Sequence, residues 1–479
     1  MRSSDEQTQQ KTSEEGWRQK VAVKPQKYAG ALSPSPAQMD TPPRAEDHSE
    51  LLEKTLEREN MKRAYQRVKQ NEGAPGVDGM DTAALAGYLK TNWEQIKEQL
   101  RTGAYRPHPV KRVDIPKPGG GKRALGIPTV LDRLIQQALL QTLTPIFDPH
   151  FSPESYGFRP GKRAHDAIRR AQEHIREGCR FVVDMDLEKF FDRVNHDMLM
   201  ARVARRVKDK RVLKLIRSYL NAGVMTNGVV TRSTEGTPQG GPLSPLLSNI
   251  LLDDLDRELT RRGHRFVRYA DDCNLFVKSK RAGIRAMESV VRFVEGKMKL
   301  KVNREKSAVD RPWKRKFLGF SFLNDKAGTI RLAPKTLERC KDKIRQLTNR
   351  TWPVAMEERI RQLNQYLRGW IGYFHVASAK KHCGELDQWL RRRLRMCLWK
   401  QWKRTWARFR NLRALGVPEW AAWMMAKSSK GPWAMARNTN NALDVTYWER
   451  QGLLTLLAHY EKLRQTLGTA GCGPACPVV

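Results

Sequence analysis

Acidic residues are scarce in this sequence. Among 479 residues, 51 are Asp or Glu and 89 are Lys or Arg, so the net charge is +38 and the pI is about 10.2. Such an excess of one sign repels itself unless a polyanion binds, and nucleic acid is the usual polyanion. An enzyme that acts only on small substrates gains nothing from this charge. We therefore expect a nucleic-acid partner.

Long hydrophobic runs and patterned cysteines are also missing. No apolar stretch is long enough to cross a bilayer, and residues 1–6 do not resemble a secretory signal. The seven cysteines are odd in number and scattered, which is typical of a reducing compartment. Only Cys472 and Cys476 lie close together, and one pair is not enough for a structural zinc site. We expect no membrane contact and a cytoplasmic location.

Two adjacent acids stand out against this basic background. Asp271 and Asp272 lie between the apolar stretches 265–268 and 274–277, which predicts two short strands with the acids at their turn. Adjacent carboxylates repel each other unless a cation binds, and Mg²⁺ prefers such oxygen ligands. Taken alone, the pair could equally be a solvated Asp-Asp turn.

A third acid strengthens the metal hypothesis. Residues 181–187 are strand-like, and Asp184 and Asp186 share one face because strand side chains alternate with period two. If this strand neighbours the hairpin in one sheet, Asp186 converges with Asp271 and Asp272. Three such carboxylates could hold two Mg²⁺ ions roughly 3.5–4 Å apart, with Mn²⁺ as an alternative ion, as in phosphoryl-transfer sites.

Two glycine-rich segments flank these acids. The strand candidates 110–115 and 123–127 enclose a glycine tip with Lys117 and Arg123 beside it, which predicts a positively charged flap or an ordinary hairpin. Residues 236–243 cannot form regular structure, and a helix should follow with Ser244 as its N-cap.

Beyond Pro334 the pattern becomes helical. Leu390, Leu394, Leu398, Trp402 and Trp406 form an apolar stripe with i, i+4 spacing. Residues 391–413 contain no acid, which favours a docked phosphate backbone over a merely solvated face. The basic residues that we expect to bind nucleic acid are Arg391, Arg392, Arg393, Arg395, Lys400, Lys403 and Arg404.

Ordered motifs give the sequence a close resemblance to the group II intron-encoded reverse transcriptases. Tyr269-Ala270-Asp271-Asp272 is similar to their catalytic hairpin, and Asp186 with Phe191 five residues later is similar to their first catalytic motif. The resemblance covers about residues 50–460. The matching segments, in chain order, are 76–79, 115–123, 155–160, 181–192, 237–245, 269–272, 300–307, 317–320 and 364–374.

The resemblance implies an α+β fold of the right-hand polymerase type, with fingers, a palm built on an antiparallel sheet, and an α-helical thumb. The expected regions are a disordered extension (1–47), an N-terminal extension with fingers (48–150), the catalytic palm with the remaining fingers (151–332), the thumb and maturase domain (333–425), and a DNA-binding region (426–479).

The family also implies roles for matching residues. Lys117 and Arg123 would fold over the nucleoside triphosphate and neutralise it. Phe191 would lie under the sugar and exclude a ribose 2′-hydroxyl. Gln239 and Gly240 would approach the incoming nucleotide and the template.

Three further polar residues carry weaker expectations. Lys306 could be a proton donor near the phosphates or simply a solvated lysine. We expect His196 to be a helix-start or packing residue, and Asp184 to be structural, since the family places its metal ligand at position 186.

The implied function is an RNA-directed DNA polymerase that copies intron RNA at a DNA target and promotes splicing. Its partners would be the group II intron RNA, target DNA, the RNA/DNA template-primer duplex and dNTPs, in the bacterial cytoplasm and at the nucleoid. Two alternatives stay open: an RNA-binding maturase with little polymerase activity, and a domesticated reverse transcriptase in defence or repair. The oligomeric state is not indicated.

One departure from many relatives concerns the C-terminus. Those relatives carry an HNH endonuclease with two cysteine pairs, whereas this sequence has one pair before Val479. We expect a nick or a replication fork to supply the primer.

Overall fold

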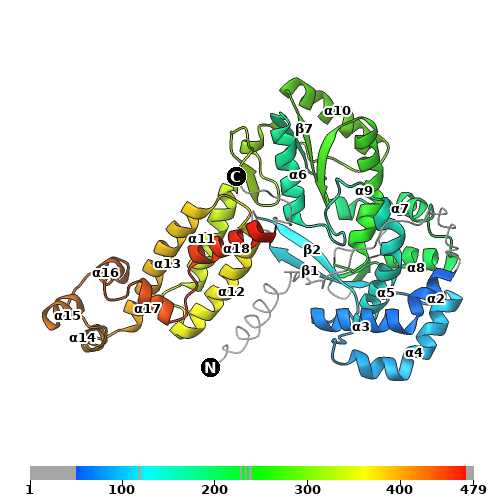
Figure 1. Cartoon of the computed structure of the whole chain (residues 1–479). Coiled ribbons are helices and arrows are strands. Elements are labelled where there is room, and N and C mark those ends of the chain that lie inside the picture. The colour runs from blue at the N-terminus through cyan, green and yellow to red at the C-terminus, as the bar shows by residue number, and fades with distance from the viewer. Residues whose placement is uncertain (1–49, 117–119, 227–228, 232–234, 237–239, 471–479) are drawn as a thin grey trace.

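The computed structural model describes residues 50–116, 120–226, 229–231, 235–236 and 240–470 (Figure 1). The predicted extension 1–47, Lys117, Gln239 and the pair Cys472 and Cys476 lie outside the described residues. In the described part of the chain, no helix combines the length and the apolar character needed to cross a bilayer.

The chain begins with helices that pack on one another. They are α2 (Leu51–Leu56), α3 (Arg58–Asn71), α4 (Leu85–Thr102) and α5 (Val130–Phe147). The apolar spacing from Leu52 to Val68 predicts one helix, but Glu57 has extended backbone (φ −55°, ψ 138°) and divides α2 from α3. Ala64 and Val68 of α3 are buried against Val130 and Leu134 of α5.

The predicted flap is an antiparallel hairpin of β1 (Val110–Pro116) and β2 (Lys122–Ile127). It belongs to a sheet with the order β2-β1-β4-β5, in which β4 (Val224–Thr226) runs parallel to β1 and β5 (Val229–Thr231) closes the edge. Strand pairing thus ties the flap to a segment about a hundred residues further along the chain.

A second sheet, with the order β6-β7-β3-β8, forms the palm. All its pairings are antiparallel, as expected. Its strands are β3 (Phe181–Met185), β6 (Arg265–Tyr269), β7 (Asp272–Val277) and β8 (Ala308–Asp310). The helices between residues 164 and 296 are α6 (Ala164–Arg176), α7 (His196–Val203), α8 (Lys210–Asn221), α9 (Ser244–Arg261) and α10 (Lys280–Gly296). The short 3₁₀ turns are Asp148–His150, Phe190–Asp192 and Pro312–Lys314.

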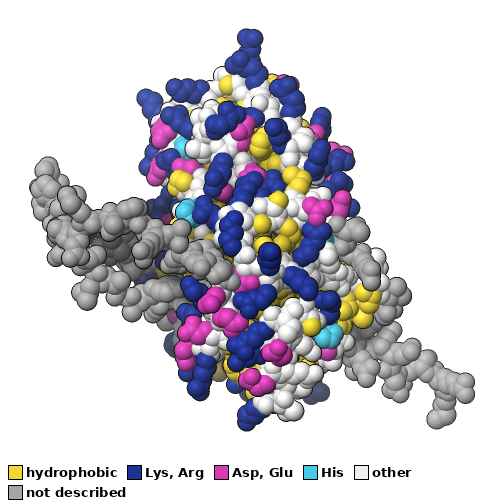
Figure 2. Space-filling model, turned by 90° about the vertical axis from the view of Figure 1, so that its right-hand side faces the viewer, with side chains coloured by type: hydrophobic (Ala, Val, Ile, Leu, Met, Phe, Trp, Pro, Cys, Tyr) yellow, Lys and Arg dark blue, Asp and Glu magenta, His cyan; other side chains and the backbone are white. Residues whose placement is uncertain are grey.

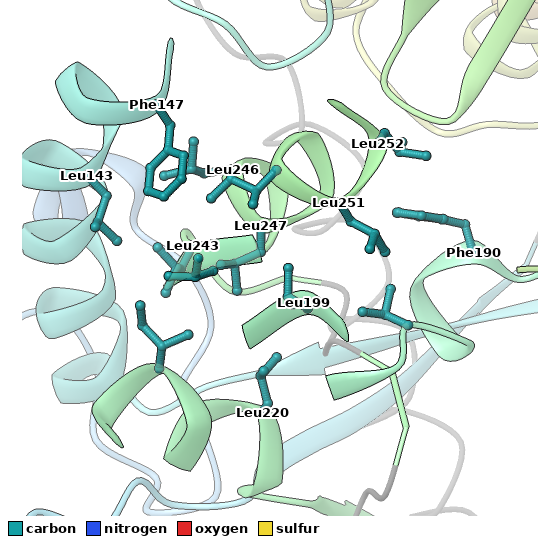
Figure 3. Close-up of a cluster of buried hydrophobic side chains, with 14 of the residues drawn as sticks. Leu143, Phe147, Phe190, Leu199, Leu220, Leu243, Leu246, Leu247, Leu251 and Leu252 are labelled. Atoms are coloured by element: carbon teal, nitrogen blue, oxygen red, sulfur yellow. The ribbon is translucent and has the colours of Figure 1, made fainter. Parts of the chain in front are cut away.

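The palm sheet separates two hydrophobic cores. Val183 and Leu275 face one core, where α9 and α10 pack, whereas Val182 and Phe276 face the other, where α6 packs. This alternation follows from the period of two along each strand. Figure 3 shows the first core where it continues into the fingers, with Leu143 and Phe147 of α5 close to the leucines of α9.

The helix after the glycine-rich segment begins one residue earlier than expected. Leu243 is the N-cap, and Ser244 is already the first helical residue. Pro245 stands in the first turn, where its missing N–H costs nothing.

The second core continues from the palm into the helical C-terminal half. A small hairpin of β9 (Phe320–Phe322) and β10 (Ile330–Leu332) leads into these helices. They are α11 (Pro334–Leu347), α12 (Met356–Phe374), α13 (Lys380–Gln401), α14 (Thr405–Ala414), α15 (Glu419–Ala426), α16 (Pro432–Asn438), α17 (Val445–Arg450) and α18 (Leu456–Ala470).

The predicted apolar stripe through Trp406 is broken. Leu390, Leu394 and Leu398 are buried in α13, but this helix ends at Gln401. Trp406 belongs to α14 and is 62% exposed. The i, i+4 spacing across residues 402–404 is therefore a coincidence of sequence.

Candidate active site

The palm sheet brings the three predicted acids to one end. Strands β3 and β7 are neighbours, and Met185 pairs with Cys273. Extending this register by one residue sets Asp186 opposite Asp272, with Cβ atoms about 4.5–5.5 Å apart for directly opposed residues. Asp271 lies in the turn that Tyr269 and Asp272 close. The condition that the sequence left open, adjacent strands in one sheet, is met.

The turn that carries Asp271 has an unusual backbone. Ala270 adopts φ +57°, which residues with a Cβ rarely do. Gly157 of the segment 155–160 packs directly on this turn, since a Cβ at position 157 would lie 2.2 Å from the Ala270 nitrogen. The glycine is thus needed so that a distant loop can support the hairpin.

A buried arginine also supports the hairpin. Arg268 and Asp256 are both 0% exposed, and the guanidinium donates to both carboxylate oxygens of Asp256 on α9. The same guanidinium donates to the Ala270 carbonyl at 2.8 Å, to Asn249 Oδ1 at 3.0 Å and to Ser155 Oγ at 2.7 Å. One side chain therefore links the acidic turn, helix α9 and the loop before Gly157.

Sequence reasoning missed this arginine. The signal was present, because Arg268 is a charged residue in a short apolar strand directly before the acids. A buried charge is tolerated only when it is paired and hydrogen-bonded, so such a position calls for a buried acid elsewhere. That acid, Asp256, could not be identified from the sequence alone.

The backbone of Asp186 is held by the segment 303–307. Its N–H donates to Ser307 Oγ at 3.0 Å, and its carbonyl accepts from the Asn303 N–H at 2.8 Å. Lys306 Nζ lies 3.8 Å from Asp186 Oδ2, and its side chain is largely exposed. Both hypotheses for Lys306, proton donor and solvated lysine, stay predictions.

Asp184 is engaged by a neighbouring arginine. Its Oδ2 accepts from Arg315 Nε at 2.9 Å and from Nη2 at 2.6 Å. Burial raises the pKa of Asp184, while Arg315 opposes the rise. These contacts agree with the expected structural role.

The acids repel one another, and a bound cation would relieve this repulsion. Surrounding protein atoms and the charges of Asp271, Asp184 and Asp186 raise the pKa of Asp272 to about 7. Solvent still reaches Asp272, so screening weakens this effect. The described residues contain no set of three or more His, Cys, Asp or Glu side chains already arranged to hold an ion. The carboxylate donors nevertheless fit Mg²⁺ chemically.

The segment that carries Phe191 is locked to the start of the glycine-rich loop. Phe191 is half-buried and meets Phe190 edge-on at 5.2 Å between ring centroids. A Cβ at Gly236 would lie 2.9 Å from the Phe191 carbonyl oxygen. His196 is buried and contacts the Gly236 carbonyl through Nε2 at 2.6 Å, which agrees with its expected packing role.

The backbone around Gly240 leaves no room for a side chain. It adopts φ +134°, and a Cβ there would lie 2.4 Å from the Gly126 carbonyl oxygen on β2. The glycine-rich loop therefore touches the flap hairpin. Arg123 lies in β2, where its backbone pairs with Ile115.

Comparison with known proteins decides the family. Residues 115–322 match the family described as reverse transcriptase (RNA-dependent DNA polymerase), and residues 337–416 match the group II intron maturase-specific domain. Protein YkfC of Escherichia coli is 35% identical over 274 residues, spanning 49% of this chain and 72% of YkfC. The group II intron-encoded protein LtrA of Lactococcus lactis is 28% identical over 411 residues, spanning 66% of this chain and 68% of LtrA.

The chain belongs to the group II intron-encoded reverse transcriptases and maturases. It is thus an RNA-directed DNA polymerase with a role in intron splicing and mobility. The family depends on divalent metal ions and has RNA partners. The α+β fold is confirmed, whereas the region boundaries and the site residues stay predictions.

In this reverse transcriptase, basic side chains are not confined to one helix. Figure 2 shows Lys and Arg spread over much of the face in view, with acidic side chains between them. The acid-free stretch 391–413, which runs from the second half of α13 into α14, is nevertheless the basic region that the sequence singles out.

The structure corrects the expectation for part of α13. Arg395 is 6% exposed and donates to the carbonyls of Ala436 at 2.7 Å and Leu443 at 3.3 Å, so it holds neighbouring segments together. Burial, together with the charges of Arg391 and Arg392, lowers the pKa of Arg395 to about 10. A guanidinium in this position is not available to a phosphate.

The other residues that we expected to bind nucleic acid are either partly buried or exposed. Arg393 donates to Thr348 Oγ1 at 2.5 Å, and Arg392 lies over the Trp433 ring at 4.0 Å, so both are partly engaged. Arg391 is half-buried. The exposed members of the set are Lys400, Lys403 and Arg404.

Proposed function

We propose that this reverse transcriptase joins dNTPs to a primer 3′-hydroxyl at Asp186, Asp271 and Asp272, which would hold two Mg²⁺ ions. The observation that carries the proposal is the pairing of β3 with β7, because it aligns Asp186 with Asp272 beside the turn of Asp271. When bound, the ions would activate the hydroxyl and neutralise the triphosphate. The protein itself contributes position and charge.

The other residues of the site would bind and select the nucleotide. Lys117 and Arg123 of the flap would face the triphosphate, where their charges offset its own. Gln239 and Gly240 would border the base pair, and the contact of Gly240 with Gly126 would couple that loop to the flap. The template would be the intron RNA, and the primer would be target DNA.

The exposed cations of the thumb would bind the RNA backbone. Lys400, Lys403 and Arg404 lie in an acid-free stretch, so their charges are not neutralised by neighbours in sequence. Phosphate contacts of this kind give affinity without reading the base sequence. Such binding would serve both template holding and splicing.

Asp271→Asn tests the metal assignment. We expect primer extension on an RNA template to fall by about 10³-fold, because a bound metal ion supplies several kcal/mol of transition-state stabilisation. RNA binding, measured by filter retention, should stay near the wild-type level. Asp310→Asn is the matched control, since Asp310 lies at the far end of β8, opposite Val182. Wild-type extension by Asp271→Asn would refute the assignment.

Phe191→Ala tests the proposed sugar contact. Removing the ring should admit ribonucleotides and lower the preference for dNTPs by about 10–200-fold, the range for one apolar contact in a pocket. The measurement is kcat/KM for dGTP and GTP on the same template-primer. Phe190→Leu is the control, since Phe190 is buried in the core beside Leu251. An unchanged ratio in Phe191→Ala would contradict the steric role.

A further inference from the structure

An exposed aromatic surface lies on α14 and α15. We call it the aromatic face and define it by Trp406, Phe409, Trp420, Trp423 and Met424. Trp406 is 62% exposed, Trp420 71% and Met424 62%, and these are the highest exposures among the large hydrophobic side chains of the described residues. The two helices form the outer end of the molecule, away from the palm sheet (Figure 1).

The rings of the aromatic face are arranged as a stack. Phe409 and Trp423 lie 4.1 Å apart between ring centroids at an interplanar angle of 21°, and Trp406 stacks on Phe409 at 5.2 Å and 26°. Trp420, Trp423 and Met424 share one side of α15, because helical residues three and four apart are neighbours. The face therefore offers flat apolar surface on an ordered support.

The core of this region is built from other side chains, against which Phe409 of the aromatic face packs. A separate core lies beneath α14 and α15, and its buried members are Trp399, Leu412, Val417, Ala421, Ala422 and Met435. The exposed aromatics are outside that set. Exposed apolar patches of this kind mark interaction sites in soluble proteins.

The charge around the aromatic face indicates the kind of partner. Residues 403–430 contain a single acid, Glu419. The exposed cations in this stretch include Lys403, Arg404, Arg410 and Lys427, and Lys427 Nζ lies 5.1 Å from the centroid of the Trp423 ring. Flat rings interleaved with cations match a polyanion that also presents π-faces.

We propose that the aromatic face binds unpaired nucleotides of a nucleic-acid strand by stacking their bases on Trp420 and Trp406. Paired bases present only their edges and backbone, so a duplex cannot use these rings in the same way. The proposal rests on the nucleic-acid binding proposed above but adds a different contact, one that depends on rings rather than on charge. RNA and DNA strands share this chemistry.

The test compares single strands with a duplex. The full chain is titrated, without dNTPs, against a labelled 12-nucleotide RNA, the DNA strand of the same sequence, and the corresponding duplex. We expect Trp420→Leu to weaken single-strand binding by about tenfold, with an unchanged salt dependence and duplex affinity within twofold of wild type. Trp420→Phe keeps a ring and should retain most of the affinity.

Two further variants separate rings from charge. Lys403→Ala should weaken binding of single strands and duplex alike and reduce the salt slope by about one. Tyr88→Leu removes an exposed aromatic side chain on α4, 40% exposed, and should leave all affinities unchanged. If Lys403→Ala binds as tightly as wild type while Trp420→Leu loses single-strand affinity, the proposed backbone contact of Lys403 is wrong and base stacking is still supported.

Several results would overturn the inference. Equal losses on single strands and duplex in Trp420→Leu would show a contact without base stacking. Wild-type single-strand affinity in that variant would remove the role of the ring altogether. A concentration-dependent dimer that Trp420→Leu abolishes, with single-strand affinity intact, would assign the aromatic face to a second copy of the chain. The RNA and DNA arms identify which strand binds better.

Discussion

The acidic hairpin and helix α13 both carry arginines beside a predicted functional surface, but the two regions use them differently. In the palm, Arg268 is buried and organises the turn that presents Asp271. In α13, Arg395 is buried and holds neighbouring segments together, while Lys400 remains exposed. Motifs locate the acids residue by residue, whereas charge composition locates only a region.

The difference has a physical origin. Strand pairing fixes position to the residue, since a slip of one would turn every side chain to the other face. The basic side chains around the apolar stripe of α13 have no such constraint, and only packing against neighbouring segments decides which of them is buried. Each basic position in α13 therefore has to be tested separately.

The largest expected effect on stability comes from a comparison of two arginines on β6, one buried and one exposed. Arg268→Ala leaves Asp256 buried without its partner, so we expect a loss of about 3–5 kcal/mol in the free energy of unfolding. Arg265→Ala is the matched control, because Arg265 pairs with Glu177 at the surface and should cost at most about 1 kcal/mol. Urea denaturation followed by circular dichroism measures both. Similar losses would mean that the buried network is not a special support of the hairpin.

A smaller effect on stability tests whether α13 contains both a structural arginine, Arg395, and an RNA-binding lysine, Lys400. Arg395→Ala leaves the carbonyls of Ala436 and Leu443 without this donor and should cost about 1–3 kcal/mol of stability. Lys400→Ala should change stability by less than about 0.5 kcal/mol but weaken RNA binding and reduce the salt slope by about one. Denaturation and salt-dependent binding are measured on both variants. A stable Arg395→Ala protein with weakened RNA binding would show that Arg395 contacts RNA rather than holding neighbouring segments together.

The smallest effect concerns the acids themselves. The pKa of Asp272 is raised to about 7, so the protonated carboxyl favours the folded state. That contribution is complete below the ordinary pKa of 3.8 and is lost as the pH rises through about 7. In EDTA at pH 8, Asp272→Asn should therefore melt about 1–2 °C above wild type. The gain should shrink at pH 5 and reverse when Mg²⁺ is added.

Asp310→Asn serves again as the control for this shift. Asp310 lies away from the other acids, so its replacement should leave the melting temperature unchanged at both pH values. A lower melting temperature for Asp272→Asn in EDTA at pH 8 would show that the carboxylate is stabilised by groups other than a cation.

Sequence reasoning came close to the palm because its signals are local. The hairpin strands, the strand before Asp186 and the flap were predicted within a residue or two, since alternation and glycine turns depend on neighbours along the chain. Predictions that needed distant partners were less complete. The break after Gln401, the burial of Arg395 and the arginine network at Arg268 all depend on segments packed from elsewhere.

The sequence by itself determined the family and the polyanionic kind of partner, and it singled out the three candidate acids, because motifs and net charge are properties of the residues in order. The tertiary structure decided that β3 lies beside β7, that Gly157 supports the Ala270 turn, and which arginines are buried. These facts depend on contacts between segments far apart in the chain, and no local period encodes them.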